Sequence, residues 1–170
     1  LVVLLIALVI FIVVFFYLQS HSNSTIPIVP ENPVYKDESA TTEARIADLL
    51  SYMTLEEKIG QMTLVEKNSV QSVSDVSKYG LGALLSGFGG RPEENTQVAW
   101  KTMVDTFMVE SQKSRLSIPL LYGVDAIHGH SNVPGFVVFP HFIGLGASGD
   151  EDLVSDIARA TKEQIQTTNI

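Results

Sequence analysis

The sequence predicts an α/β domain of parallel strand-helix units, preceded by one hydrophobic transmembrane or signal helix. Two observations carry this prediction. Residues 1–18 are all apolar, and residues 41–170 alternate between short apolar runs and segments with the period of a helix. The order strand, helix, strand, helix, strand with nearly all-apolar strands is typical of parallel βα units.

Residues 1–18, LVVLLIALVIFIVVFFYL, contain no charge, no Pro and no Gly. As a helix rising about 1.5 Å per residue they would span about 27 Å, nearly the hydrocarbon thickness of a bilayer. A cleaved secretory signal is the alternative, although its apolar stretch is usually shorter, roughly 7–15 residues. A retained anchor is the favoured interpretation. Both interpretations place the rest of the chain outside the cytoplasm, membrane-anchored or secreted.

Residues 19–40 are predicted to be an extended linker. They are rich in Ser, Asn and Pro, with prolines at positions 27, 30 and 33, and they show neither a helical nor a strand period. Such a composition is typical of a tether.

The globular part, residues 41–170, is predicted to contain three strands and five helices. The strands are expected at 61–65, 82–85 and 120–124. The first helix is expected at 44–53, and a second, short helix is expected to begin at Thr54, which forms a capping box with Glu57. Further helices are expected at 74–79 before Gly80, at 95–114, and from Asp150 through Ile165. In the long helix, the residues expected to face the core are Val98, Met103, Val104, Phe107 and Met108.

Three βα units are too few to close a barrel, and an open doubly wound sheet ordinarily has more strands as well. The sequence begins without Met and ends at Ile170, directly after a predicted helix, where a further strand would be expected. We therefore expect it to be a fragment of a longer protein.

Charge and cysteine content exclude several classes of function. The formal net charge is −8, from 11 Lys and Arg against 19 Asp and Glu, and there is no cysteine. Such an acidic chain offers no basic patch to neutralise phosphates, so a nucleic-acid partner is not expected. Without cysteine there is no thiol nucleophile, zinc-thiolate site or disulfide scaffold.

The segment richest in candidate functional side chains is YGVDAIHGH at 122–130. It is predicted to be a buried strand followed by a loop that contains an Asp and two His residues. In parallel α/β architectures the carboxyl ends of the strands carry the site, so Asp125 is expected in the mouth of the site. An ionised Asp can accept hydrogen bonds from two adjacent hydroxyl groups, which is what a sugar ring offers. The structural alternative is that Asp125 caps a turn or pairs with an Arg.

His128 and His130 form an H-x-H pair, which on a strand places both rings on one side and can bind a divalent metal, as in metal-dependent amidohydrolases. Such sites need further ligands, and the only other histidines are His21 and His141. Metal binding is therefore the weaker interpretation, and no metal or other cofactor is predicted. The favoured alternative is that both imidazoles bond to loop backbone and line the pocket wall.

The glycine-rich segment SGFGGRP at 86–92 resembles a phosphate cradle only superficially. It is followed by no Lys-Ser/Thr pair and does not have the G-x-G-x-x-G register. A turn at the mouth of the site is predicted instead.

Four stretches together resemble one family closely. They are MTLEEKIGQM at 53–62, GALLSG at 82–87, SRLSIPLLYGVDAIHGHSNV at 114–133 and FPHFIGLGAS at 139–148. In this order they resemble the family 3 glycoside hydrolases, in particular the β-glucosidase and exo-β-glucanase branch. The branch that releases N-acetylglucosamine continues with a D-Q-E-G-G-type sequence after the shared Asp, which AIHG at 126–129 does not match.

The resemblance implies a (β/α)8 TIM-type barrel that packs on a second α/β domain, with the active site between them. Residues 41–170 would be the N-terminal portion of that barrel, an incomplete barrel of the first three or so βα units. The Asp of the family motif falls on Asp125, which implies that Asp125 binds hydroxyl groups of the terminal glucose. The implied partner is a β-glucoside or β-glucan oligosaccharide.

The family's catalytic motifs are missing from this sequence. Retaining hydrolysis needs two carboxyl groups roughly 5 Å apart. The family's nucleophile lies in an S-D-W-like strand end and its acid/base further on; neither motif, nor the family's K-H pair, occurs here. Asp105, Asp150 and Asp152 do not replace the nucleophile, because they lie in or at predicted helices.

The sequence therefore predicts a β-glucosidase fragment with one substrate-binding residue, Asp125, and no catalytic residue of its own. Its further partners would be the membrane, through residues 1–18, and the missing C-terminal part of the same chain. The alternatives are a membrane-tethered sugar-binding remnant without catalysis and, less favoured, a metal-dependent hydrolase.

Overall fold

The computed structural model describes residues 10–13, 26–87 and 89–170. Residues 10–13 are helical; the rest of the predicted membrane or signal segment, and the start of the predicted linker, lie outside the described residues. No helix in the described ranges is both long enough and apolar enough to cross a membrane. The chain divides into two compact units, Leu1–Thr54 and Leu55–Ile170.

The first unit contains the 3-10 turn η1 (Val34–Lys36) and helix α2 (Thr42–Tyr52). The two are joined by polar contacts: the backbone N–H of Tyr35 donates to Asp48 Oδ2 at 2.9 Å, and Arg45 Nε donates to the carbonyl of Tyr35 at 3.0 Å. The helix confirms the prediction. The linker prediction is wrong at its end, because Tyr35 is bonded to both helix residues and the chain around it is folded against α2.

The second unit is an α/β domain. Its elements in chain order are α3 (Leu55–Gln61), β1 (Leu64–Glu66), the 3-10 turn η2 (Lys67–Ser69), α4 (Asp75–Tyr79), β2 (Ala83–Ser86), α5 (Gln97–Ser111), β3 (Leu121–Val124), α6 (Phe142–Ala147) and α7 (Glu151–Gln166). The strands form one parallel sheet in the order β1-β2-β3. The predicted α/β class with parallel βα units is confirmed.

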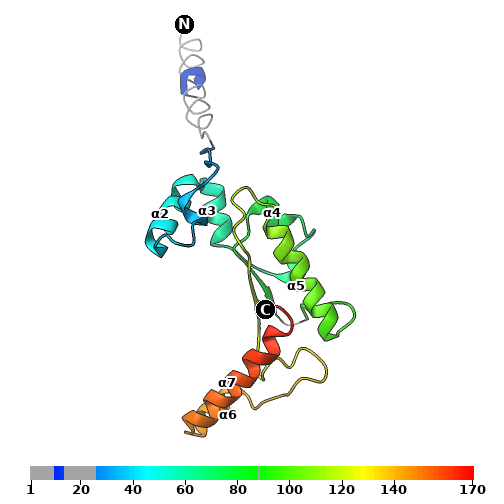
Figure 1. The fold of residues 1–170 in the computed structure, drawn as a ribbon. Helices are drawn as coiled ribbons and strands as arrows, with labels where there is room; N and C mark the ends of the chain where they lie inside the picture. The colour runs from blue at the N-terminus through cyan, green and yellow to red at the C-terminus, as the bar shows by residue number, and fades with distance from the viewer. Residues whose placement is uncertain (1–9, 14–25, 88) are drawn as a thin grey trace. The chain divides into compact units, whose positions relative to one another are not determined.

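The core of this unit lies between the sheet and the helices α4 and α5, which run beside it in Figure 1. Its buried members are Val76, Leu81, Leu84, Phe107 and Leu120. Burying a side chain of this kind contributes roughly 1.5–3 kcal/mol to folding. Because these residues come from α4, from α5, and from β2 and the segments that precede β2 and β3, their contacts pack the two helices against the sheet.

The buried face of α5 differs from the predicted one. Val98 is 75% exposed, whereas Trp100, absent from the predicted core, is 1% exposed. Trp100, Val104 and Phe107 are all buried and follow one another at intervals of four and three residues, which places them on one face of a helix. Val98 precedes Trp100 by two residues and therefore points away from that face.

The first strand begins later than predicted, because α3 continues through Gln61. The backbone N–H of Met62 donates to the carbonyl of Lys58 at 3.2 Å, and that of Thr63 to the carbonyl of Gly60 at 3.0 Å. These residues thus close a helix, and the strand pairing starts at Leu64.

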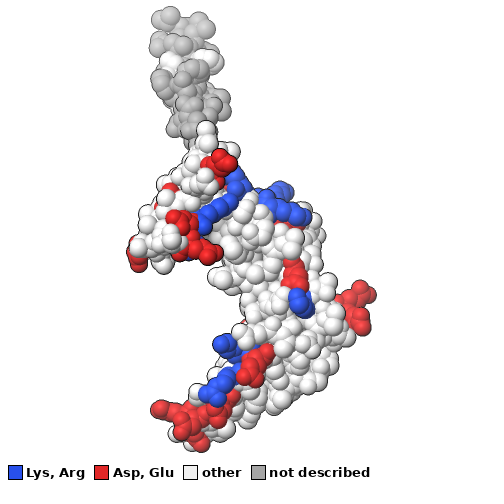
Figure 2. Space-filling view, in the orientation of Figure 1, with Lys and Arg blue, Asp and Glu red and all other residues white. Residues whose placement is uncertain are grey.

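Helix α7 begins where the sequence predicts. Asp150 Oδ1 accepts a hydrogen bond from the backbone N–H of Leu153 at 2.9 Å. Two further acidic residues, Glu151 and Asp152, occupy the first turn, and Figure 2 shows acidic side chains gathered at this end of the helix. Negative charge there is favourable, because the N-terminus of a helix carries a partial positive charge.

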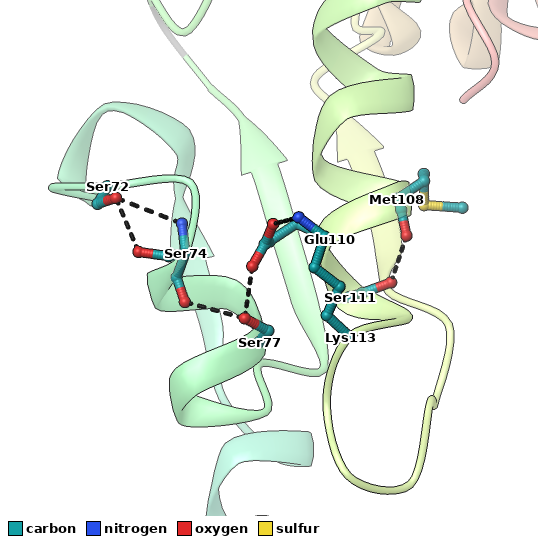
Figure 3. Close-up of polar contacts among 7 residues, drawn as sticks. All are labelled: Ser72, Ser74, Ser77, Met108, Glu110, Ser111 and Lys113. Carbon is teal, nitrogen blue, oxygen red and sulfur yellow. Dashed lines mark hydrogen bonds and ion pairs between the residues drawn. The ribbon is translucent and has the colours of Figure 1, made fainter.

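Helices α4 and α5 share a polar contact, drawn in Figure 3. Glu110 of α5 is buried and accepts hydrogen bonds from the hydroxyl of Ser77 at 2.6 Å and from Lys113 Nζ at 2.7 Å. These two bonds, that from Lys113 first, lower the pKa of Glu110. The carboxylate therefore stays ionised and ties α4 to α5.

Candidate functional site

The carboxyl ends of the three strands lie along one edge of the sheet. In the parallel register Glu66 is opposite Leu85, and Ser86 is opposite Val124. Asp125 directly follows β3 and is exposed. It thus occupies the edge that carries the functional groups in parallel α/β proteins, as the sequence predicts.

Two acidic side chains flank Gly87 at this edge. A Cβ atom placed on Gly87 would lie 3.6 Å from Asp125 Oδ2 and 3.8 Å from Glu66 Cγ. Glu66 Oε2 accepts a hydrogen bond from the backbone N–H of Asn68 at 2.8 Å. Glu66 Oε1 is buried, and no described residue bonds to it. Sequence reasoning missed Glu66, the last residue of β1, although the first strand was predicted to end directly before it.

The described residues of the glycine-rich segment agree with the predicted turn, because the backbone N–H of Gly90 donates to the carbonyl of Gly87 at 2.9 Å. The hydroxyl of Ser86 donates to the carbonyl of Gly90 at 2.6 Å, which leaves its oxygen to accept from the hydroxyl of Tyr122 at 2.7 Å. Gly89 has a φ of +86°, a conformation that favours glycine. A Cβ atom on Gly90 would lie 2.9 Å from Glu66 Oε1. Burial raises the pKa of Tyr122, with a smaller contribution from the charge of Glu66.

His128 anchors the loop that follows Asp125. Its Nδ1 lies 2.9 Å from the carbonyl oxygen of Phe139, and the backbone N–H of Phe139 donates to the carbonyl of His128 at 2.9 Å. Because a carbonyl oxygen can only accept, Nδ1 carries the proton. Gly129 has a φ of +70°, and a Cβ atom there would lie 2.8 Å from the ring of Phe139. The predicted bond between this imidazole and loop backbone is confirmed.

His130 is fully buried and has different neighbours. Its Nε2 lies 3.1 Å from Thr168 Oγ1, and its ring meets Trp100 and Phe136 edge-on with centroids 5.4 and 5.6 Å apart. The hydroxyl of Thr168 donates to the carbonyl of Ile165 at 2.7 Å, so it accepts from His130 Nε2–H. His130 therefore bonds to a side chain, and the prediction of a bond to loop backbone is wrong for this ring.

The two rings of the H-x-H pair are thus held apart by separate partners. Within the ranges that the structure describes, no group of three or more His, Asp or Glu side chains is arranged to hold a metal ion. His128 instead connects the loop after Asp125 to Phe139, and His130 connects that loop to Thr168.

Burial without a charged partner lowers the pKa of His130 from its ordinary value of 6.5. Below pH 6.5 the unfolded chain therefore binds a proton at this residue that the folded chain does not, and the free energy of unfolding decreases as the pH falls. The slope reaches at most about 1.4 kcal/mol per pH unit. We expect His130→Gln, which keeps a donor toward Thr168, to remove this part of the pH dependence in urea denaturation between pH 7 and 5. Identical pH dependence in both proteins would contradict the assignment.

A parallel βα sheet with carboxylates at the carboxyl ends of its strands defines a class: α/β domains whose site lies at that edge, as in barrel enzymes. Residues 54–170 match the family model described as the glycosyl hydrolase family 3 N terminal domain. The chain belongs to this family, and the resemblance stated from its motifs is confirmed.

Named relatives of this chain are glycosidases. A periplasmic β-glucosidase of Salmonella typhimurium is 32% identical over 142 residues, which are 79% of this chain and 16% of the relative. A lysosomal β-glucosidase of Dictyostelium discoideum is 26% identical over 142 residues, 74% of this chain and 17% of the relative. The crystal structure of an exo-1,3/1,4-β-glucanase from a Pseudoalteromonas species superposes with a TM-score of 0.67 at 36% identity, covering 84% of this chain and 19% of that one. The chain therefore spans less than a fifth of the length of these three proteins.

Proposed function

We propose that this chain is the N-terminal part of a retaining β-glucosidase that removes terminal β-D-glucosyl residues from glucosides or short glucans outside the cytoplasm. Family membership supports glycoside hydrolysis, and the names of the relatives support a β-glucoside or β-glucan substrate. One relative is named periplasmic and another lysosomal, which supports a location outside the cytoplasm. The three βα units then form the first part of the barrel.

The observation that carries the proposal is the position of Asp125. Its carboxylate is exposed at the carboxyl edge of the sheet and lies beside Gly87, which leaves room for a ligand to approach. An ionised carboxylate in this position can accept hydrogen bonds from two neighbouring sugar hydroxyls. Asp125 acts in substrate binding, and it holds the terminal glucose for carboxyl groups supplied by later parts of the chain.

Other Asp residues of this chain are engaged in structural contacts, which supports assigning the nucleophile to a later part. Asp105 accepts bonds from Lys101 Nζ at 2.6 Å and from Asn169 Nδ2 at 2.5 Å, and these bonds lower its pKa. Asp150 caps α7. Neither carboxylate lies at the end of a strand.

The test is to express the continuous reading frame that contains this sequence and to assay it with an aryl β-glucoside. We expect hydrolysis in which β-glucose is the first product detected by NMR, because two displacements retain the configuration. The 170-residue chain alone is expected to show no turnover above background. A frame that stops after Ile170, or a longer protein that binds glucose without cleaving glucosides, would instead indicate the sugar-binding remnant. Turnover by the short chain that Asp105→Asn or Asp152→Asn abolishes would also contradict the proposal.

A further inference from the structure

Three hydrogen bonds connect the first turn of α5 to the backbone of Asp125. Trp100 Nε1 donates to Asn95 Oδ1 at 2.7 Å. Asn95 Nδ2 donates to the carbonyl of Asn132 at 3.0 Å, and Asn132 Nδ2 donates to the carbonyl of Asp125 at 3.2 Å. We call this set of bonds the amide relay.

The direction of each bond in the amide relay is fixed by chemistry. An indole N–H can only donate, so Asn95 must present its oxygen to Trp100 and its NH₂ group to the carbonyl of Asn132. Asn132 likewise faces a carbonyl with its NH₂ group. Because every acceptor in the amide relay has a donor, neither amide can turn over without placing two oxygens or two N–H groups against each other.

The amide relay starts in the rigid core and ends at the exposed edge. Trp100 is 1% exposed and packs edge-on against the buried ring of His130. Asp125 lies at the other end, where regular structure stops after β3. A bond to the carbonyl of Asp125 restricts rotation about its Cα–C bond, and thereby fixes where its carboxylate stands relative to the loop that follows.

We propose that Asn95 and Asn132 are positioning residues for substrate binding, which hold the backbone of Asp125 so that its carboxylate meets the sugar hydroxyls. This inference rests on the proposed function, because it assigns the two amides to the same site. A displacement of about 1 Å at a binding group can lower the rate by about 100-fold. The loss of the amide relay is therefore expected to appear in kcat/KM.

The experiment uses the complete enzyme with Asn132→Asp and Asn95→Asp. Each change keeps the size of the side chain but replaces NH₂ by an oxygen that repels the facing carbonyl. We expect kcat/KM for an aryl β-glucoside to fall by about 10- to 100-fold in each variant. Asn32→Asp, the same change at an exposed position outside the second unit, is the matched control and is expected to leave kcat/KM unchanged.

The decisive readout is the effect of Asn132→Asp in an Asp125→Ala background. If Asn132 acts through Asp125, the second change has no further effect on kcat/KM there, because the group that it positions is gone. A merely structural role would lower kcat/KM by the same factor in both backgrounds, and that result would overturn the inference. If Asn132→Asp does not fold, Asn132→Ala, which removes the donor without adding a repulsion, gives the same comparison with the same two outcomes.

The outcomes separate this inference from the proposed function. A native enzyme that does not cleave glucosides contradicts the proposed function. An active enzyme in which Asp125→Ala is impaired while both Asn132 variants keep normal kcat/KM contradicts the amide relay alone.

Discussion

Replacing Asp125 by alanine in the complete enzyme is expected to lower kcat/KM for an aryl β-glucoside by at least about 100-fold. The change removes two charge-assisted hydrogen bonds to sugar hydroxyls, each worth about 1.5–3 kcal/mol. Since a tenfold change in kcat/KM corresponds to about 1.4 kcal/mol, the loss of two such bonds exceeds a factor of 100. Steady-state kinetics with a single substrate measure it.

Two further variants make this measurement specific. Asp125→Asn keeps the shape and one acceptor but loses the charge, so its kcat/KM is expected between those of the native and alanine enzymes. Asp152→Ala removes an exposed carboxylate from the first turn of α7 and is expected to keep native kcat/KM. Near-native kcat/KM in Asp125→Ala would show that Asp125 has a structural role.

Gly60→Ala is expected to cost about 3 kcal/mol or more in the free energy of unfolding. A Cβ atom on Gly60 would overlap the carbonyl oxygen of Tyr79 and lie 2.6 Å from that of Gly80. The carbonyl of Gly60 also accepts a hydrogen bond from the backbone N–H of Gly82 at 2.8 Å. The atoms that meet this Cβ are backbone atoms, which cannot move aside as the end of a flexible side chain would. The added methyl group must therefore push α3 away from the segment that leads into β2.

Urea denaturation of the purified protein, with Gly146→Ala as the matched control, checks this prediction. Gly146 lies within α6, and nothing is within 4 Å of the position of its Cβ atom. Alanine is the better helix former by about 0.5–1 kcal/mol, so this variant is expected to be as stable as the native protein or slightly more so. Equal stability of the two variants would mean that the close approach at Gly60 is absent.

The elements with strong local signals were predictable from the sequence. Gly80 ends α4 with a φ of +57°, and Asp150 caps α7 through its own side chain. The sheet was predictable because its strands are short apolar runs between helices. Each of these signals lies within a few residues of the element that it determines.

Other features depend on distant residues and could not be predicted in this way. Helix α5 has apolar residues on several faces, so its period alone does not decide that Trp100 is buried and Val98 exposed. Helix α6 is short and contains two glycines, which weakens its signal; His141 Nδ1 caps it by accepting from the backbone N–H of Ile143 at 3.1 Å.

At the candidate site, too, some residues were predictable from the local sequence and others were not. Asp125 was predictable because it directly follows an apolar strand. Glu66 directly follows the predicted first strand, 61–65, so the same signal could have found it. What the sequence does not show is that the folded chain brings Glu66 and Asp125 to the same glycine, Gly87. The contact between Asn95 and Asn132 joins residues 37 positions apart, so only the folded chain reveals it.

The strand order has a consequence for how the protein is made. Each strand pairs with the strand synthesised before it, β2 with β1 and β3 with β2. Each newly synthesised strand can therefore pair with a strand that has already been made. It does not remain unpaired until a later segment is synthesised. Unpaired strand edges are the sites at which nascent chains aggregate. As the sheet grows in the order of synthesis, each arriving strand covers one edge of the strand before it, so the open edges are confined to β1 and the newest strand.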